Sequence, residues 1–447
     1  MGWFDSKSLQ ADVRPREIWS WAGYDFANSG YTTVVLTAVF NAYFVGVVAG
    51  NADWGTLAWT LTLAASNVLG IVLMPAIGAA ADLHANKKRW LALITAICVT
   101  ATAGLAFTGA GTLWLAVVLV VISNFAFNAG IALNSAFLPE LARPAALGKV
   151  SGWGWAFGYL GGIVALGLCL AWVLNGQARG EPASVYVPPT LLITAAIYLL
   201  AALPMFLFVR ERAQPRSDAS LAELMAESHR RLFHTLRALP QFRDFAWLAL
   251  CGVMYQAGIA VVIALAAIYA QAVMAFSTAE TMALILVVNI TAAIGAFAFG
   301  YVQDALGHKP ALALTIAIWI AMVLIAALSS SAAMFWLAAN LAGIAMGSSQ
   351  SAGRAMVAAL APRARSAEFY SFWNVAVWVS AIIGPVTYGL VTWLTDNDHR
   401  LAILVTGLYF VVGLLFLIPV NVERGQAVAA SADAEDERLL VAADPGR

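Results

Sequence analysis

The sequence predicts an all-α polytopic membrane protein whose twelve transmembrane helices form two pseudo-symmetric six-helix bundles. Of its 447 residues, 62% are hydrophobic and 11% are charged, and the mean hydropathy is +0.81. Soluble domains are about 45–50% apolar and about 25% charged. The composition therefore excludes a soluble globular protein, a disordered chain and a nucleic-acid-binding protein. Twelve apolar runs and an internal repeat give the helix number and the pseudo-symmetry.

Each apolar run is long enough to cross about 30 Å of hydrocarbon, which takes roughly 20 residues in a helix. Polar Tyr24, Asp25 and Asn28 interrupt the first run, so we expect it to stay in the mature protein and not to act as a signal peptide. The predicted spans are 18–49, 57–80, 90–110, 113–137, 151–174, 188–209, 245–274, 279–302, 310–329, 332–359, 368–394 and 401–420.

The basic residues predict the orientation. With this set of spans, every Lys and Arg outside the spans except Arg179 and Arg400 falls on one side, and Arg354 lies inside a span. Lys and Arg near spans are retained on the cytoplasmic side. We therefore expect a multi-pass protein of the cell membrane (inner or plasma membrane) with both termini in the cytoplasm.

Four parts of the chain follow from this division. An N-terminal six-helix bundle covers 1–210, and a polar linker with amphipathic helical spacing covers 211–244. A C-terminal six-helix bundle covers 245–422. The tail 423–447 is Ala-rich and acidic, and we expect it to be disordered.

Two loops carry the same pattern, G-x-x-x-D followed by basic residues, at an offset of about 220 residues. Gly lets two helices approach closely, the Asp can face a neighbouring helix N-terminus, and the basic cluster stays in the cytoplasm. Six spans duplicated in parallel explain the offset, and a gating role is expected for the loops. The gating residues are Gly78, Asp82, Lys87 and Arg89 in the first copy, and Gly300, Asp304, Gly307 and Lys309 in the second.

Asp25 and Arg354 are the ionisable residues predicted to lie well inside the membrane. A charge costs at least about 2.5–3.5 kcal/mol at a helix centre, so such residues usually face a polar cavity or a partner. Both are candidates for substrate binding or coupling. The alternative is a structural ion pair or cap that packs two helices.

Other polar and aromatic side chains recur on the helices expected to line a central cavity. Tyr24, Asp25 and Asn28 share helical spacing on the first span, and amides follow it on the fourth and tenth. Each amide could instead bond a neighbouring helix, and the aromatics could simply pack. The remaining candidates for the substrate site are Asn124, Asn128, Tyr255, Gln256, Gln350, Asn374 and Trp378.

No pattern indicates a metal site or a cofactor. Cys98, Cys169 and Cys251 lie in apolar runs, are odd in number, and are interpreted as packing residues. H-E-x-x-H, G-x-S-x-G and P-loop motifs are absent, and an intramembrane aspartyl enzyme would need a second carboxylate beside Asp25. An enzyme is therefore not expected.

Four groups of residues form a recognisable signature. They are Trp21-Ala-Gly-Tyr24-Asp25-Phe26-Ala27-Asn28-Ser29, Phe137-Leu138-Pro139-Glu140, Gly148-Lys149-Val150-Ser151-Gly152, and Gln350 and Arg354 with Ala367-Glu368-Phe369. This signature resembles that of the autophagy-related-protein-22-like branch of the major facilitator superfamily. The resemblance implies the major facilitator fold. Because fungal members are regarded as vacuolar amino-acid effluxers, it also implies export of amino acids or similar solutes.

The expected function is alternating-access transport of a small solute, with efflux as the expected direction. A zwitterionic amino acid would suit the site, with its carboxylate on Arg354 and its ammonium near Asp25. Coupling to protons through Asp25 stays open. The alternatives are export of another organic solute or drug, and a membrane sensor that binds a solute without moving it. The expected partners are the small-molecule substrate, protons if coupling occurs, and membrane lipids, with no nucleic acid and a monomeric state.

Overall fold

The computed structural model describes residues 9–83, 86–135, 137–141, 143, 147–212, 239–362 and 366–443, and these are helical apart from short connections. Twelve of the described helical segments are long and apolar enough to cross a membrane, which confirms the predicted number. The first span, Pro15–Val48, comprises α1 (Pro15–Tyr31), a π-helical segment (Thr32–Ala38), α2 (Phe40–Tyr43) and a second π-helical segment (Phe44–Val48). The later spans lie in α3 (Gly55–Leu83), α4 (Lys87–Gly104), α5 (Leu113–Ser135), α7 (Leu147–Ala178), α8 (Ala183–Phe208), α10 (Arg243–Met274), α11 (Thr278–Leu306), α12 (His308–Leu328), α13 (Ala332–Leu360), α14 (Ser366–Leu394) and α15 (His399–Leu417).

The chain forms two compact units. Unit 1 comprises Met1–Ser228, Val262–Ile290 and Pro385–His399, and unit 2 comprises His229–Val261, Thr291–Gly384 and Arg400–Arg447. Unit 1 thus contains α1 to α8 together with one end each of α10, α11 and α14. The predicted division into bundles 1–210 and 245–422 rests on the repeat and stays a prediction.

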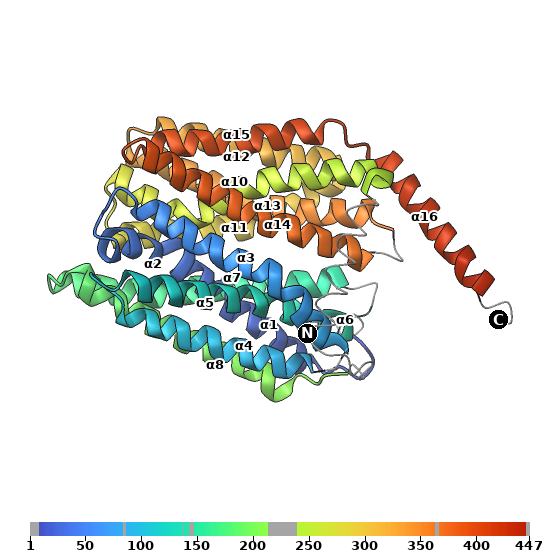
Figure 1. The fold of residues 1–447 in the computed structure, drawn as a ribbon, viewed down its shortest axis with the longest axis horizontal. Coiled ribbons are helices and arrows are strands. Elements are labelled where there is room, and N and C mark those ends of the chain that lie inside the picture. The colour runs from blue at the N-terminus through green and yellow to red at the C-terminus, as the bar shows by residue number, and fades with distance from the viewer. Residues whose placement is uncertain are drawn as a thin grey trace. The chain divides into compact units, whose positions relative to one another are not determined.

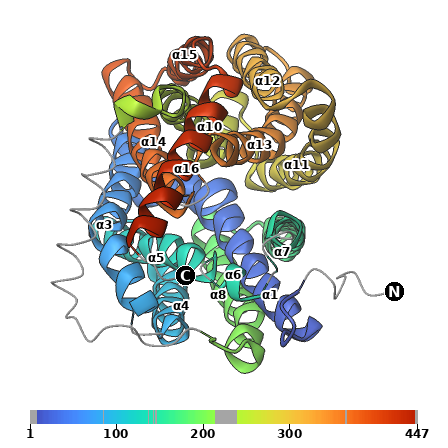
Figure 2. The same cartoon turned by 90° about the vertical axis from the view of Figure 1, so that its right-hand side faces the viewer.

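In unit 1, α1 runs between α7 and α8 (Figure 2). A stripe of glycines on α7 makes this packing possible, because a glycine presents no side chain to the neighbouring helix. A β-carbon at Gly154 would lie 2.6 Å from the Asp25 carboxylate, and one at Gly161 would collide with the Phe26 carbonyl. The glycines of this span therefore set how closely α1 and α7 approach.

Unit 2 uses the same packing solution. A β-carbon at Gly384 of α14 would collide with the Ala257 carbonyl of α10. Nearby, Gly258 leaves room for the ring of Phe410, which stacks on Trp319 with centroids 5.2 Å apart. Small residues thus allow close helix contact at corresponding places in the two repeats.

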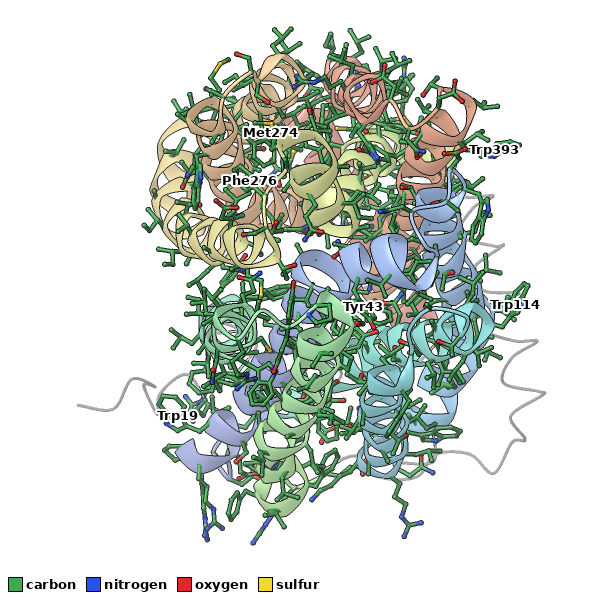
Figure 3. The ribbon with its side chains drawn as sticks, turned by 90° about the vertical axis from the view of Figure 1, so that its left-hand side faces the viewer. Trp19, Tyr43, Trp114, Met274, Phe276 and Trp393 are labelled. Atoms are coloured by element: carbon green, nitrogen blue, oxygen red, sulfur yellow. The ribbon has the colours of Figure 1, made fainter. Side chains whose placement is uncertain are left out.

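Large apolar side chains cover the outer surface of the helices, as expected for lipid-facing positions. Aromatic residues lie near helix ends: Trp114 is 78% exposed and Trp393 is 48% exposed, and both point away from the helices that carry them (Figure 3). Aromatic belts at the level of the lipid headgroups have this character.

The prediction that the tail is disordered is wrong for most of its length. Residues Val422–Ala443 form α16, which continues beyond the ends of α10 and α13 (Figure 1). Its first turns are held by an ion pair between Arg424 and Asp244, and Gly425 packs against Leu360. The Ala and Glu residues that made the tail Ala-rich and acidic also favour a helix.

The predicted amphipathic linker helices fall within 213–238, which lie outside the described residues. The described part of the linker is the segment before residue 213 and a 3-10 turn, Leu239–Phe242, that leads into α10.

Candidate functional site

Asp25 is half-buried on α1, facing α5 and α7. One of its carboxylate oxygens accepts a hydrogen bond from Asn134 Nδ2 at 3.2 Å. The same Asn134 accepts, through its backbone carbonyl, a 2.9 Å bond from the indole N–H of Trp21. Asn134 is thus the side chain that positions Asp25, and its Oδ1 has no hydrogen-bond partner among the described residues.

Tyr24 and Asn28 lie on a different face of α1 from Asp25. The Tyr198 hydroxyl of α8 donates to Asn28 Oδ1 at 2.7 Å and lies 3.3 Å from the Tyr24 hydroxyl, which bonds Thr95 of α4 at 2.8 Å. All four side chains are buried. The expected single stripe is therefore divided: Asp25 is rotated by about 100° from Tyr24, whereas Asn28, four residues after Tyr24, returns to within about 40° of it and shares its neighbour Tyr198.

Asn124 of α5 is buried and donates to Ser66 of α3 at 2.9 Å. This is the interhelical bond that the alternative interpretation of the amides predicted. Asn128, one turn further along α5, is half-buried.

In unit 2 the structure brings two predicted residues together. The amides of Gln256 on α10 and Gln350 on α13 exchange reciprocal bonds of 3.3 Å. Tyr255 is fully buried beside Gly353, with its ring 6.4 Å from that of Trp373. The two glutamines therefore form a polar centre at membrane depth inside unit 2.

The other candidates in unit 2 lie on α13 and α14. Arg354 lies on α13, one turn beyond Gln350, and its side chain is outside the described residues. On α14, Asn374 is exposed and Trp378 is half-buried.

Among the predicted gating residues, the basic ones have defined contacts. The Lys87 ammonium pairs with Glu140 of the short helix α6 (Leu138–Leu141) at 3.0 Å, and Arg89 is exposed. The Lys309 ammonium bonds the Ile418 and Val420 carbonyls at 2.9 and 2.6 Å. It therefore satisfies carbonyls at the end of α15.

The remaining gating residues are placed by the backbone. Gly307 has φ +85° at the start of α12, a conformation that favours glycine. Gly78 and Asp82 belong to α3, and Gly300 and Asp304 to α11. The side chains of the two aspartates lie outside the described residues.

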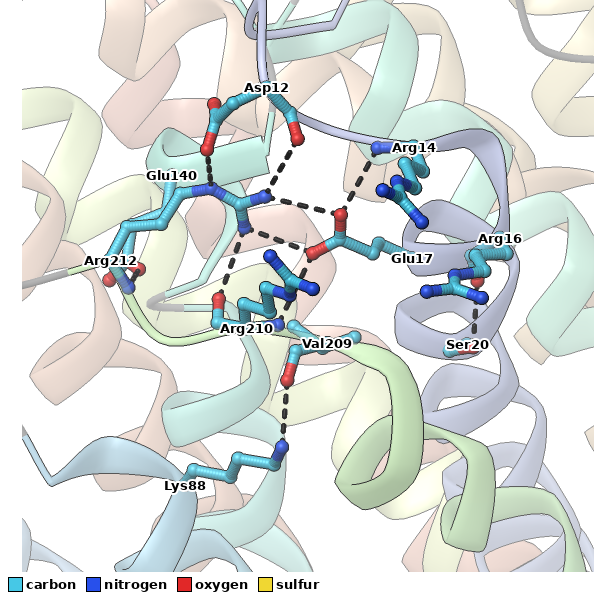
Figure 4. A network of polar contacts seen from close by, with 10 residues as sticks. All are labelled: Asp12, Arg14, Arg16, Glu17, Ser20, Lys88, Glu140, Val209, Arg210 and Arg212. Atoms are coloured by element: carbon cyan, nitrogen blue, oxygen red, sulfur yellow. Dashed lines mark hydrogen bonds and ion pairs between the residues drawn. The ribbon is translucent and has the colours of Figure 1, made fainter.

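Sequence reasoning missed a cluster of ion pairs at the end of unit 1 where Arg14, Lys87 and Arg210 lie. Arg212 follows α8, and its two terminal nitrogens donate hydrogen bonds to the Glu17 carboxylate of α1 at 3.0 and 3.1 Å. Its Nε donates to Asp12 at 2.6 Å (Figure 4). The Glu17 side chain is only 3% exposed. We call the Glu17–Arg212 contact the N-clamp.

Unit 2 has a matching contact. Arg424, after α15, donates to both carboxylate oxygens of Asp244 on α10, at 2.8 and 2.7 Å. Asp244 also accepts a 2.8 Å bond from the backbone N–H of Asn421. We call the Asp244–Arg424 contact the C-clamp. In each repeat, a carboxylate at the start of the first helix holds an arginine that follows the sixth helix.

The hydrogen bond from Arg212 lowers the pKa of the Asp12 carboxyl below its ordinary value of 3.8. Burial acts to lower the pKa of the Arg212 guanidinium, but its bonds to Glu17 and Asp12 outweigh burial and raise that pKa. In the C-clamp, the hydrogen bond to Asp244 raises the pKa of Arg424. The guanidinium groups of both clamps are therefore charged at neutral pH.

The sequence did hold a signal for the clamps. Glu17 and Asp244 are the acidic residues that open the first span of each repeat, and an arginine follows the last span of each. Pairing them required knowing that the first and sixth helices of a repeat meet at that end.

At the opposite end of unit 1, helices from both repeats touch. The Ala264 carbonyl of α10 accepts bonds from Asn41 Nδ2 at 3.0 Å and from the Trp59 indole N–H at 3.1 Å. Gly389 of α14 packs against Thr60 of α3. This end of unit 1 is therefore closed by α2 and α3 against parts of α10 and α14.

Cys98, Cys169 and Cys251 are free and buried, as their interpretation as packing residues requires. Within the described part of the chain, no group of three or more His, Cys, Asp and Glu side chains could hold a metal ion.

Twelve membrane-spanning helices that form paired repeats with internal polar centres are the architecture of a secondary membrane transporter. The family described as "Vacuole effluxer Atg22 like" matches residues 56–430. This chain belongs to that family and is a membrane transporter of the major facilitator type, and not an enzyme.

Curated relatives agree with this family. The uncharacterized MFS-type transporter YxiO of Bacillus subtilis (strain 168) is 26% identical over 415 residues, which cover 92% of this chain and 96% of that protein. Autophagy-related protein 22 of Candida glabrata is 28% identical over 192 residues, 40% of this chain and 34% of that protein.

Solved structures share the fold. A D-xylose-proton symporter superposes with a TM-score of 0.69 at 17% identity, over 92% of this chain and 98% of that one. The nucleoside transporter NupG superposes with a TM-score of 0.67 at 15% identity, over 91% and 99%.

Proposed function

We propose that this protein exports a zwitterionic amino acid, or a solute of similar chemistry, across the cell membrane by alternating access. The observation that carries the proposal is a polar centre in each unit at membrane depth. One is the Asp25 carboxylate held by Asn134, and the other is the Gln256–Gln350 amide pair. Efflux is proposed because the family is described as vacuole effluxers.

Each centre, taken by itself, has chemistry that suits one of the two charged groups of a zwitterion. A half-buried carboxylate such as Asp25 attracts an ammonium group, and carboxamides can both donate to and accept from a carboxylate. We propose that Arg354, one turn beyond Gln350 on α13, is the residue that binds the carboxylate of the solute. The buried pair Tyr24 and Asn28 is proposed to support α1 and not to touch the solute.

Alternating access is supported by the closure at the end of unit 1 that contains Ala264. Two side-chain donors share one carbonyl there, and these bonds can break without leaving a charge unpaired. We propose that both termini are cytoplasmic, which places this closure on the outer side of the membrane.

The test is counterflow into proteoliposomes with a panel of amino acids, nucleosides, sugars and amphiphilic cations. We expect saturable amino-acid transport that Gln350→Ala and Arg354→Ala abolish. Asn340→Ala and Arg243→Ala are matched controls, since Asn340 bonds its own helix at the Trp336 carbonyl and Arg243 is an exposed helix-end residue. If only solutes of another class are transported, the alternative function, export of another organic solute or drug, would be favoured. Binding without transport would favour a sensor.

Proton coupling is tested in the same vesicles by imposing a pH gradient. If Asp25 carries the proton, the gradient accelerates transport by the wild type and not by Asp25→Asn. Equal rates with and without the gradient in the wild type would leave facilitated diffusion as the mechanism.

A further inference from the structure

An apolar groove of about 360 Å³ lies on unit 1, where α1, α7 and α8 meet. The side chains that line it are apolar except for Ser20, and Trp19 is 41% exposed, so the groove opens on the surface of the unit. In Figure 3, Trp19 lies at the outer margin of unit 1. The lining residues that matter below are Trp19, Gly23, Phe26, Phe157, Ala201 and Pro204.

The groove is a consequence of side-chain size. Gly23 and Ala201 form its floor, where a β-carbon on Gly23 would lie 2.9 Å from the Ala201 carbonyl. Phe157 forms a wall, with its ring 5.2 Å from Trp19 and 5.4 Å from Phe26. The small residues Gly23 and Ala201 and the aromatic rings together leave an apolar slot beside α1.

A cationic group lies about one helical turn from the lining residues, beyond Ser20 on α1 and beyond Pro204 on α8. The Ser20 hydroxyl donates to the Arg16 carbonyl at 2.7 Å, which places Arg16 one turn from the lining residues. The guanidinium of Arg16 lies over the Phe208 ring, 5.6 Å from its centroid. Phe208 is one turn beyond Pro204 on α8, so α1 and α8 both lead from the groove to Arg16.

The surrounding charges leave this end positive. The carboxylates described near this end already have partners: Arg212 holds Asp12 and Glu17, Lys87 pairs with Glu140, and Glu211 accepts bonds from the backbone N–H groups of Lys87 and Lys88. Arg14, Arg16 and Arg210 are exposed and form no ion pair with the described residues, and Figure 4 shows them around the N-clamp. An anion at this end would therefore meet guanidinium groups that no described carboxylate neutralises, beside an apolar slot.

We propose that the groove binds an anionic phospholipid of the cytoplasmic leaflet, with an acyl chain between α7 and α8 and the phosphate at Arg16. Basic residues next to apolar surfaces between helices recognise anionic lipid headgroups in this way. Arg14 and Arg210 add to the local positive charge. The bound lipid lies against α1 and α7, the helices whose close contact depends on the glycine stripe.

The test measures lipid binding by native mass spectrometry of the purified protein, with phosphatidylglycerol and phosphatidylethanolamine of the same acyl chains. We expect preferential binding of phosphatidylglycerol. Arg16→Ala should weaken it about fivefold, as expected for one basic residue near a membrane surface. Arg243→Ala, an exposed arginine of α10, is the matched control and should leave binding unchanged.

A second pair of variants tests the groove itself. Ala201→Phe fills the slot, whereas Leu200→Phe adds bulk at a neighbouring side chain that is 68% exposed. We expect phosphatidylglycerol binding to fall only in Ala201→Phe, and Ala201→Val serves if the larger residue prevents folding. Equal binding of the two lipids, or equal losses in Arg16→Ala and Arg243→Ala, would overturn the proposal. The readout does not require transport, so it fails or succeeds independently of the proposed function.

Discussion

Replacing Arg212 with alanine removes the cation from the N-clamp and leaves Glu17 buried. The carboxylate would keep two backbone donors, the N–H groups of Arg14 at 3.1 Å and Arg210 at 3.2 Å. The Glu17 side chain is 3% exposed and that of Arg212 only 18% exposed, so water reaches the carboxylate only through the space that the lost guanidinium leaves. Removing one partner of a buried pair costs about 3–5 kcal/mol, and the two remaining bonds favour the lower end, about 3 kcal/mol.

Arg424→Ala is the matched perturbation in unit 2. Asp244 is also 3% exposed, but the Arg424 side chain is 50% exposed, so water already screens its side of the pair. The cost should be nearer that of exposed pairs, about 1 kcal/mol. The structure therefore predicts unequal effects from two chemically identical substitutions.

The assay is thermal unfolding of the purified protein in detergent, followed by tryptophan fluorescence. Arg89→Ala is the control, because Arg89 is an exposed residue at a helix start. Arg212→Ala should lower the melting temperature most, Arg424→Ala less and Arg89→Ala least. Adding Glu17→Gln to Arg212→Ala should recover part of the loss, since it removes the unpaired buried charge. Equal shifts for Arg212→Ala and Arg89→Ala would refute the reasoning.

Three further substitutions test other parts of the structure. Gly161→Ala should destabilise the protein by about 1–3 kcal/mol in the same thermal assay, because the added methyl meets the backbone of α1. At Gly167 the added methyl has open space, so Gly167→Ala should be neutral. Equal effects of the two substitutions would contradict the close approach of α7 to α1. Trp59→Phe removes one of the two donors to the Ala264 carbonyl, a hydrogen bond worth about 0.5–1.5 kcal/mol. It should speed the labelling of a cysteine introduced at that end of unit 1 by a membrane-impermeant maleimide. An unchanged labelling rate would show that this bond does not hold the end closed. Asp12→Asn should cause a small destabilisation at pH 7, since a carboxylate with a lowered pKa stabilises the fold only while it is ionised. The difference from the wild type should shrink as the pH falls below 3.8, the ordinary pKa, and disappear once the pH is below the lowered pKa of the folded protein. A difference that persists in strong acid would rule out the ion pair as its cause.

The two clamps give each repeat a fixed end. The N-clamp joins α1 to the chain after α8, and Lys88 bonds the Val209 carbonyl that ends the same helix at 2.8 Å. In unit 2, Lys309 and Arg424 do the same for the end of α15. First, third and sixth helices are thus held together at one end of each repeat.

Hydropathy and charge were sufficient to predict the twelve spans. A segment in hydrocarbon must satisfy its backbone hydrogen bonds internally, so a long apolar run can only be a helix there. The offset of about 220 residues between Gly78 and Gly300 similarly predicted the duplicated helices. Both are local properties of the chain, and they need no knowledge of which helix touches which.

Side-chain placement on α1 was only partly predictable. The spacing of Tyr24, Asp25 and Asn28 indicated a polar region of the helix, but not which neighbour each residue meets. The structure turns Tyr24 and Asn28 towards Tyr198 of α8 and Asp25 towards Asn134 of α5. A helical pattern fixes relative angles along one helix, and only packing fixes the rotation of that helix against its neighbours.

The sequence by itself determined that this protein crosses the membrane twelve times in two repeats, and it gave Gln256 and Gln350 as candidates for a substrate site, two amides that the structure brings into hydrogen-bond contact. The tertiary structure alone decided the clamps and the groove. Glu17 and Arg212 are 195 residues apart, and Asp244 and Arg424 are 180 apart. Such pairs leave no periodic signal, because their contact depends on which helix ends meet after the bundle has closed.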